Sequence, residues 1–235
     1  MHALLDGDIV AFRTAAVCET EDAPLAIWQA NEFIKRVLSD VNADTWQIYL
    51  TGDNNFRYKL YPDYKANRRD KPKPKHLEAV KEFLVSEWTT IITDGYEADD
   101  ALGIALTEND EAICCSIDKD LLQIPGRHYH FVNRGFSEVL ENEGWKTFYT
   151  QLLIGDAVDN IPGCPGIGKV KAPKILEYCE TPFDMYEACR RQYELAKVSL
   201  DKMHLSAQLL YILRRQEDEW KPPLGPVQQE PAAAQ

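Results

Sequence analysis

Short apolar runs alternate with amphipathic stretches along the first 145 residues of the chain. The stretches at 24–38 and 76–87 repeat apolar residues every three or four positions, as helices do, and a further helix is expected from about Glu97. The apolar runs are typical of buried strands, and the last of them is the weakest: 2–5, 46–51, 89–93, 112–117 and 128–132. This alternation predicts an α/β fold with a mostly parallel central sheet flanked by helices. The inner face of the first helix is expected to carry Leu25, Trp28, Phe33 and Val37.

The pattern becomes helical from about residue 146. A turn-rich stretch at 160–168 (NIPGCPGIG) separates helical segments, and a last helix is expected at 201–216. The residues after Trp220 are rich in proline and poor in apolar side chains, which is typical of disorder. We therefore expect a core at 1–145, a helical module at 146–216 and a disordered tail at 217–235.

Composition narrows the class of protein. No run approaches the ~20 apolar residues that span a bilayer, and the N-terminal MHALLDGDIV has no secretory signal pattern. The six cysteines include no C-x-x-C pair, so neither a zinc site nor a redox motif is indicated. We expect a cytoplasmic protein with no membrane partner, located in the host cytoplasm if a phage encodes it.

The charge of the chain is unevenly distributed. The formal net charge is −12, yet residues 54–76 hold eight lysines and arginines and only two acids. Such a segment attracts phosphate, and its interleaved aromatic residues could stack on bases. A solvated linker punctuated by proline is the alternative. The aromatic content favours a mobile flap or arch over the active site, at about 54–88; the aromatic residues are Phe56, Tyr58, Tyr61 and Tyr64.

The excess acid is concentrated in five short motifs: LLDGD, YLTGD, YEADD, CSIDKD and IGDAVDN. Asp6, Asp53 and Asp118 each follow a predicted strand, and the carboxyl ends of parallel strands share one edge of a sheet. Carboxylates gathered there would raise one another's pKa values unless hard divalent cations bind them. Each motif alone could be a turn or an acidic helix start, but five together indicate a site for two magnesium ions.

At these motifs the sequence resembles the 5′ nuclease family, which includes flap endonucleases, the 5′-nuclease domain of bacterial DNA polymerase I and stand-alone bacteriophage 5′→3′ exonucleases. The resemblance runs in order over residues 3–180, through DGDIVAFR, FRYKLYPDYKANR, YEADDALG, SIDKDLLQI and IGDAVDNIPGCPGIGKVKA. It implies a PIN-like nuclease core at 1–145 and a helix–turn–helix-type duplex-binding module at 146–216.

The resemblance also implies roles for individual residues. The first magnesium would be held by Asp6, Asp53, Glu97, Asp99 and Asp100, and the second by Asp118, Asp120, Asp156 and Asp159, with Mn²⁺ as a substitute. Lys65 and Arg68 would hold the scissile phosphate, with Asp6, Glu97 and Asp118 completing the catalytic set. Further DNA contacts are implied for Arg13, Tyr64, Gly166, Gly168, Lys169 and Lys171. The last module can bind a potassium ion through backbone carbonyls in family members, and Asp8 is either a ligand or a turn residue.

These roles predict a monomeric, metal-dependent 5′→3′ exonuclease and 5′-flap endonuclease. Its substrates would be DNA with 5′ ends, flaps or duplex–single-strand junctions, and RNA in hybrids. The alternatives are a PIN-like ribonuclease acting on RNA or RNA primers, and a non-catalytic protein that binds branched DNA. The sequence leaves open the balance of exonuclease and flap-endonuclease action, and the short segment between Arg68 and Glu97 leaves open whether a strand is threaded.

Overall fold

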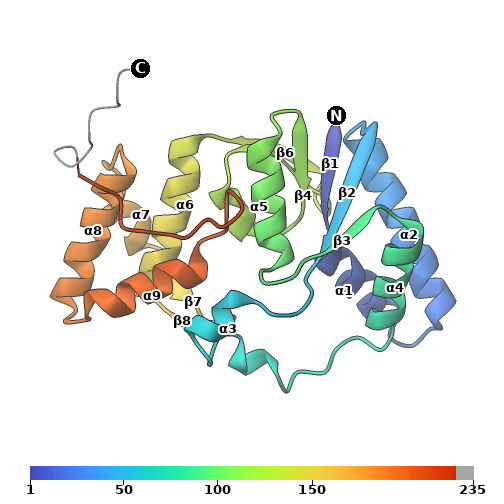
Figure 1. The fold of residues 1–235 in the computed structure, drawn as a ribbon, viewed down its shortest axis with the longest axis horizontal. Helices are drawn as coiled ribbons and strands as arrows, with labels where there is room; N and C mark the ends of the chain where they lie inside the picture. The colour runs from blue at the N-terminus through green and yellow to red at the C-terminus, as the bar shows by residue number, and fades with distance from the viewer. Residues whose placement is uncertain (226–235) are drawn as a thin grey trace.

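A six-stranded sheet runs through the computed structural model, which describes residues 1–225 (Figure 1). The strand order is β3-β2-β1-β4-β5-β6, and all neighbours are parallel except β6, which pairs antiparallel with β5. The predicted α/β class with a mostly parallel sheet is therefore confirmed, and the edge strand β6 is an addition that the sequence pattern did not predict. The strands are β1 (His2–Asp6), β2 (Thr45–Leu50), β3 (Thr90–Ile92), β4 (Ala112–Cys115), β5 (Gly126–His130) and β6 (Gly135–Val139).

Helices cover both faces of this sheet (Figure 1). On one face, α1 (Gly7–Val17), α2 (Ala23–Asp40) and α4 (Leu77–Glu87) enclose a core that includes Leu5, Ile34 and Leu84. On the other face, α5 (Ala98–Glu108) packs on Leu4 and Cys114. None of the helices within residues 1–225 is both long enough and apolar enough to span a bilayer.

Two details of the first face differ from the sequence prediction. The DGD motif is not a turn, because α1 begins at Gly7 directly after β1 and a Cβ at that position would lie 2.6 Å from the carbonyl oxygen of Tyr49. The expectation that Trp28 faces inward is wrong, since its side chain is 55% exposed. Two alanines and three aliphatic residues form the inner face instead, and the helix packs mainly against α1 and α4; the buried residues are Ala26, Ala30, Ile34, Val37 and Leu38.

The C-terminal half forms a helical layer beside the sheet, as expected. A second core joins its helices through Phe148, Tyr149, Leu152 and Tyr193. The expected boundary at 145/146 falls inside α6, and the helix expected at 201–216 ends at Leu210. The elements are α6 (Glu141–Ile154), the hairpin of β7 (Gly155–Asp156) and β8 (Ile161–Pro162), α7 (Lys171–Ile175), α8 (Pro182–Leu195) and α9 (Leu200–Leu210).

The chain after α9 runs back across α6 towards α8 (Figure 1). Disorder was expected from residue 217, but Trp220 is only 5% exposed and its ring lies 6.1 Å from that of Phe148 and 5.6 Å from that of His204. The prediction is wrong for 217–225, because burial of one large aromatic side chain holds an otherwise polar segment. The rest of the predicted tail, 226–235, lies outside the described residues.

Replacing the two tryptophans tests this packing. We expect Trp220→Ala to lower the free energy of unfolding by about 3–5 kcal/mol, since it leaves a cavity in a packed core. Trp28→Ala, the matched change at an exposed position, should cost less than about 1 kcal/mol. Urea unfolding followed by circular dichroism measures both, and equal losses would show that residues 217–225 do not stabilise the fold.

Candidate active site

Four of the five acidic motifs, all except YLTGD, converge near the ends of β1 and β4, which are neighbours in the sheet. Asp6 is the last residue of β1 and caps α1 by accepting a hydrogen bond from the Ile9 amide (3.0 Å). Ser116, just after β4, donates to Asp6 Oδ2 (2.7 Å), and its hydroxyl oxygen accepts from the Asp118 amide (3.0 Å). Ser116 therefore fixes the first acidic motif against the fourth. This serine lies within the CSIDKD motif, and no local pattern predicts its role.

Burial makes this edge electrostatically unfavourable in the absence of a cation. Desolvation, reinforced by Asp8 and Asp118, raises the pKa of Asp6 to about 7. The pKa of half-buried Asp99 is raised well above its usual value, first by burial and then by Asp6 and Asp118. Burial and the adjacent Asp118 raise the pKa of Asp120 to about 6. Residues from three separate motifs thus share one desolvated negative region.

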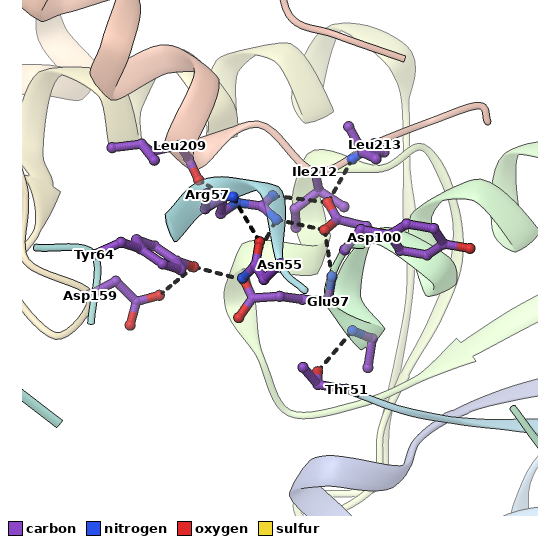
Figure 2. Close-up of polar contacts among 12 residues, drawn as sticks. Thr51, Asn55, Arg57, Tyr64, Glu97, Asp100, Asp159, Leu209, Ile212 and Leu213 are labelled. Atoms are coloured by element: carbon purple, nitrogen blue, oxygen red, sulfur yellow. Dashed lines mark hydrogen bonds and ion pairs between the residues drawn. The ribbon is translucent and has the colours of Figure 1, made fainter. Parts of the chain in front are cut away.

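Two more carboxylates are held beside this region by cations. Glu97, which caps α5, forms an ion pair with Lys65 and accepts a hydrogen bond from the Tyr64 hydroxyl (2.7 Å; Figure 2). Burial alone would raise the pKa of Glu97, but Lys65 and Arg57 hold it below its usual value. The Lys65 ammonium also lies 3.7 Å from Asp159 Oδ2. Its backbone is left-handed, with φ of 54°, and its amide donates to the Asp159 carbonyl (2.9 Å).

Arg68 joins the β7–β8 loop to the same network. Its guanidinium forms an ion pair with Asp159, and its Nε donates to the Val158 carbonyl (3.2 Å). Asp156 shapes this loop by accepting from the amide of Val158 (2.7 Å). The structure therefore brings Lys65 and Arg68 to the acidic region together with Glu97 and Asp159.

Three acids of the predicted motifs are not part of this network. Asp53 is exposed, and its side chain makes no hydrogen bond or ion pair within residues 1–225. Asp8 pairs with Lys81 (3.0 Å) and accepts from the Thr51 amide (2.9 Å), which is a structural use. Asp100 is fully buried, and other groups occupy both of its oxygens. The expectation that Asp100 is a metal ligand is not supported by these contacts.

Asp100 is the buried partner of Arg57 (Figure 2). Its guanidinium, only 3% exposed, donates to both oxygens of Asp100 (2.6 and 2.9 Å) and to the carbonyls of Leu209 (2.9 Å) and Tyr211 (2.7 Å). Asp100 also accepts from the amide of Glu97 (3.0 Å). We call these contacts the Arg57 clamp. The clamp joins α3 (Phe56–Leu60), the start of α5 and the end of α9. Arg57 differs from the other cations of the basic segment only in its buried position.

The basic segment is thus partly structural. Tyr64, which the sequence predicts to contact DNA, is 2% exposed and donates hydrogen bonds to Glu97 and Asp159, so without DNA its side chain is used inside the site. Tyr58 is 45% exposed and remains available for stacking. After the 3₁₀ turn η1 (Ala66–Arg68), the chain passes beneath the end of the sheet and enters α4 (Figure 1). The Lys75 amide ties the far end of the segment to Glu19 (3.0 Å).

The remaining predicted DNA-binding residues lie outside this network. Arg13 is half-buried on α1 and forms no ion pair within the described part of the chain. Gly166 (φ of 77°), Gly168 and Lys169 are exposed in the turn before α7. The Lys171 ammonium donates to the Gly166 carbonyl (3.0 Å), which orders this turn. The glycine and lysine residues form a separate exposed surface on the helical layer.

The donor set at the acidic edge fits a hard divalent cation. All of its donors are carboxylate oxygens, which Mg²⁺ prefers, and Asp120 Oδ1 is buried without a hydrogen-bond partner. No three acidic, histidine or cysteine side chains within residues 1–225 are already grouped as a complete metal site. Glu97 and Asp159 instead contact Lys65 and Arg68. The edge therefore supplies ligands, and some of them would have to exchange partners.

Comparisons with known proteins agree with this geometry. The family described as 5′-3′ exonuclease, N-terminal resolvase-like domain, matches residues 1–150. DNA polymerase I of Rhizobium leguminosarum is 31% identical over 183 residues, which cover 66% of this chain and 18% of the polymerase. The 5′-3′ exonuclease of Aquifex aeolicus is 31% identical over 160 residues, which cover 60% of this chain and 55% of the relative. The match thus spans about a fifth of the polymerase and about half of the exonuclease.

Solved structures share the fold. A bacteriophage T5 5′-exonuclease with bound zinc matches with a TM-score of 0.71 at 18% identity, covering 89% of this chain and 89% of that chain. A bacteriophage T5 flap endonuclease in a pseudo-enzyme–product complex with DNA and metal ions matches with a TM-score of 0.70 at 18% identity, covering 89% and 88%. The likeness extends beyond the sheet into the helical layer.

Identical changes at two adjacent acids should have opposite effects on stability. Asp100→Asn removes the anionic partner of a buried guanidinium, and we expect a loss of about 3–5 kcal/mol in the free energy of unfolding. Asp99→Asn removes a charge that burial and its neighbours disfavour, so it should stabilise the metal-free protein. Urea unfolding in a chelator at about pH 8 measures both changes. A shift of the same sign in both variants would contradict the separate roles assigned to them.

The raised pKa values also predict how stability depends on pH. Asp6, Asp99 and Asp120 bind protons in the folded state at a higher pH than in the unfolded state, where their pKa values return to about 3.9. The metal-free protein should therefore gain stability as the pH falls from about 8 to about 6. Thermal unfolding in a chelator tests this, with Asp99→Asn as a variant whose gain should be smaller. A wild-type melting temperature that falls over this range would rule out the proposed desolvation.

Proposed function

We propose that this chain, which belongs to the 5′-3′ exonuclease family through its N-terminal resolvase-like domain, hydrolyses phosphodiester bonds of DNA near 5′ ends, flaps or junctions. One observation supports the proposal above all. Desolvated carboxylates from separate motifs meet at the end of the sheet, directly beside two cations that can hold a phosphate, Lys65 and Arg68. That pairing of anionic metal ligands with phosphate-binding cations suits phosphodiester hydrolysis.

Two magnesium ions are the proposed cofactors, with Mn²⁺ as a substitute. Asp6, Asp99, Asp118 and Asp120 would hold them, because these side chains are desolvated or lie against desolvated carboxylates. Further ligands would come from Glu97, Asp156 and Asp159. Bound divalent cations would neutralise the negative charge that develops as water attacks the phosphate. Asp53 could act only through water, and Asp100 has a positioning role through the Arg57 clamp.

Lys65 and Arg68 are the proposed phosphate-binding residues. Without substrate, their cationic groups contact Glu97 and Asp159. A substrate phosphate would draw these groups to its own oxygens and so release carboxylate oxygens for metal binding. Tyr64 keeps its hydrogen bond to Glu97 through this exchange and limits the movement of that side chain. The charge on Lys65 would then stabilise the pentacovalent transition state, where it is needed most.

The DNA partner is proposed from two exposed basic surfaces. Lys71 and Lys73 line the segment beneath the sheet, and Lys169 and Lys171 flank the glycine turn before α7. Contacts to phosphate position a duplex without reading its bases, so cleavage should depend on DNA shape. The T5 flap endonuclease of similar fold was solved with DNA and metal ions. A potassium ion bound by carbonyls near Gly166 would reinforce the second surface, and the protein is proposed to act as a monomer.

Cleavage of a 5′-flap oligonucleotide with and without magnesium tests the function. Wild-type protein should release the flap only with the metal, and Asp118→Asn with Asp120→Asn should abolish release while the fold is retained. A parallel substrate with an RNA flap separates DNA preference from the ribonuclease alternative. Binding of flapped DNA without cleavage under any divalent metal would identify a non-catalytic DNA-binding protein and refute the proposal.

A pair of lysine variants separates chemistry from affinity. Lys65→Ala should lower the single-turnover rate at saturating enzyme by about 10²–10³, since one preorganised charge beside the transition state is lost. Lys73→Ala, an equal change of charge at an exposed position, should alter mainly the association rate and its salt dependence. The measurements are single-turnover cleavage in magnesium and equilibrium DNA binding in calcium. Similar rate losses in the two variants would show that Lys65 only attracts phosphate.

A further inference from the structure

An apolar pocket of about 470 Å³ lies between α3, the turn before α5 and the segment after α9. Its walls include Phe56, Tyr96, Tyr211 and Trp220, and Leu60 at its mouth is 40% exposed. None of the carboxylates proposed as metal ligands lines it. The volume suits one or two large apolar side chains of a ligand, and no step of the proposed nuclease reaction uses this pocket.

The rim of the pocket is acidic. Glu217, Asp218 and Glu219 follow one another along it, and Lys59 alone is basic among the described residues that line the pocket. The rim is held in place by hydrogen bonds, because Asp218 accepts from the Tyr211 hydroxyl (2.9 Å) and the Arg214 amide (3.2 Å). Glu217 is exposed at φ of 57° and forms no ion pair within residues 1–225.

This combination selects one class of ligand. Negative charge on the rim repels the phosphates of DNA, whereas lysine and arginine are attracted to it. The aromatic walls favour an apolar or aromatic side chain, and they also stabilise a cation placed over a ring. A protein segment with an apolar anchor next to basic residues satisfies both conditions.

We propose that this pocket binds a short cationic segment of a partner protein, with an apolar side chain filling the pocket and basic side chains contacting Glu217 and Glu219. The pocket borders the catalytic machinery, and none of the lysines and arginines proposed to bind phosphate lines it. Phe56 and Tyr96 immediately precede Arg57 and Glu97 in the sequence, and Tyr211 supplies a carbonyl to Arg57. The bound segment would therefore contact residues at or beside all three elements that the Arg57 clamp joins. The proposal does not depend on the nuclease assignment, since binding can be measured on metal-free protein.

A random peptide library displayed on phage, panned against the full chain in a chelator, tests the proposal. We expect the enriched peptides to carry an aromatic or aliphatic residue beside lysine or arginine. Glu217→Lys with Glu219→Lys should weaken their binding at least about tenfold, equivalent to ~1.4 kcal/mol, and Leu60→Gln should weaken it through the apolar wall. Glu108→Lys with Glu111→Lys makes the same charge change at exposed positions elsewhere and should leave binding unchanged.

Two results would overturn the proposal. The first is that every enriched peptide binds the Glu217→Lys, Glu219→Lys variant as tightly as the wild-type protein, or that no peptide is enriched. The other is displacement of the peptides by a single-stranded oligonucleotide that binds the wild-type protein and loses affinity on Leu60→Gln, which would assign the pocket to nucleic acid. Glu217 and Glu219 are both exposed, so the variant is expected to fold, and a circular dichroism spectrum and unfolding midpoint equal to those of the wild type check this.

Discussion

Confinement of negative charge at the ends of β1 and β4 is the constraint on which the rest of the site depends. A parallel sheet brings these ends together, and burial then raises the pKa values of Asp6, Asp99 and Asp120 because each charge loses water near other carboxylates. Polar groups from neighbouring elements offset part of this desolvation: Ser116 donates a hydrogen bond to Asp6, and Lys65 forms an ion pair with Glu97. A divalent cation would meet the remainder, so metal binding and folding stability are linked in this protein.

The Arg57 clamp extends that constraint to the whole molecule. The buried guanidinium of Arg57 hydrogen-bonds to Asp100, and its remaining N–H groups also need acceptors. The carbonyls of Leu209 and Tyr211 are those acceptors. The orientation of Glu97 at the start of α5 therefore depends on residues far along the chain. The sheet and the helical layer are packed as one unit at this point, which is why a division of the chain at 145/146 does not match the contacts.

Local patterns predicted most of the fold. Apolar runs of strand length located β1, β2, β3, β4 and β5, and the ordered acidic motifs indicated the edge of the sheet where most of these carboxylates meet. The pattern could not predict α1, because its helical start follows an aspartate and a glycine that read equally well as a turn. It could not distinguish Asp99 from Asp100 either, since adjacent helical positions point in different directions and only tertiary packing shows which one meets Arg57. Trp220 was missed for the same reason: its polar, proline-rich neighbours outweigh one aromatic residue in any local reading.

The dependence of Arg57 on Leu209 and Tyr211 has a consequence for synthesis of the protein. A ribosome releases the strands and all of the acidic motifs well before it releases α9. Until then Arg57 lacks two of its acceptors, and the core that holds Phe148 lacks Trp220. Domains generally acquire their packing as units during translation, so the acidic edge of a nascent chain would remain loosely held. The arrangement of Glu97 and its neighbours would thus be fixed only after α9 has been synthesised, although every proposed metal ligand precedes that helix in the chain.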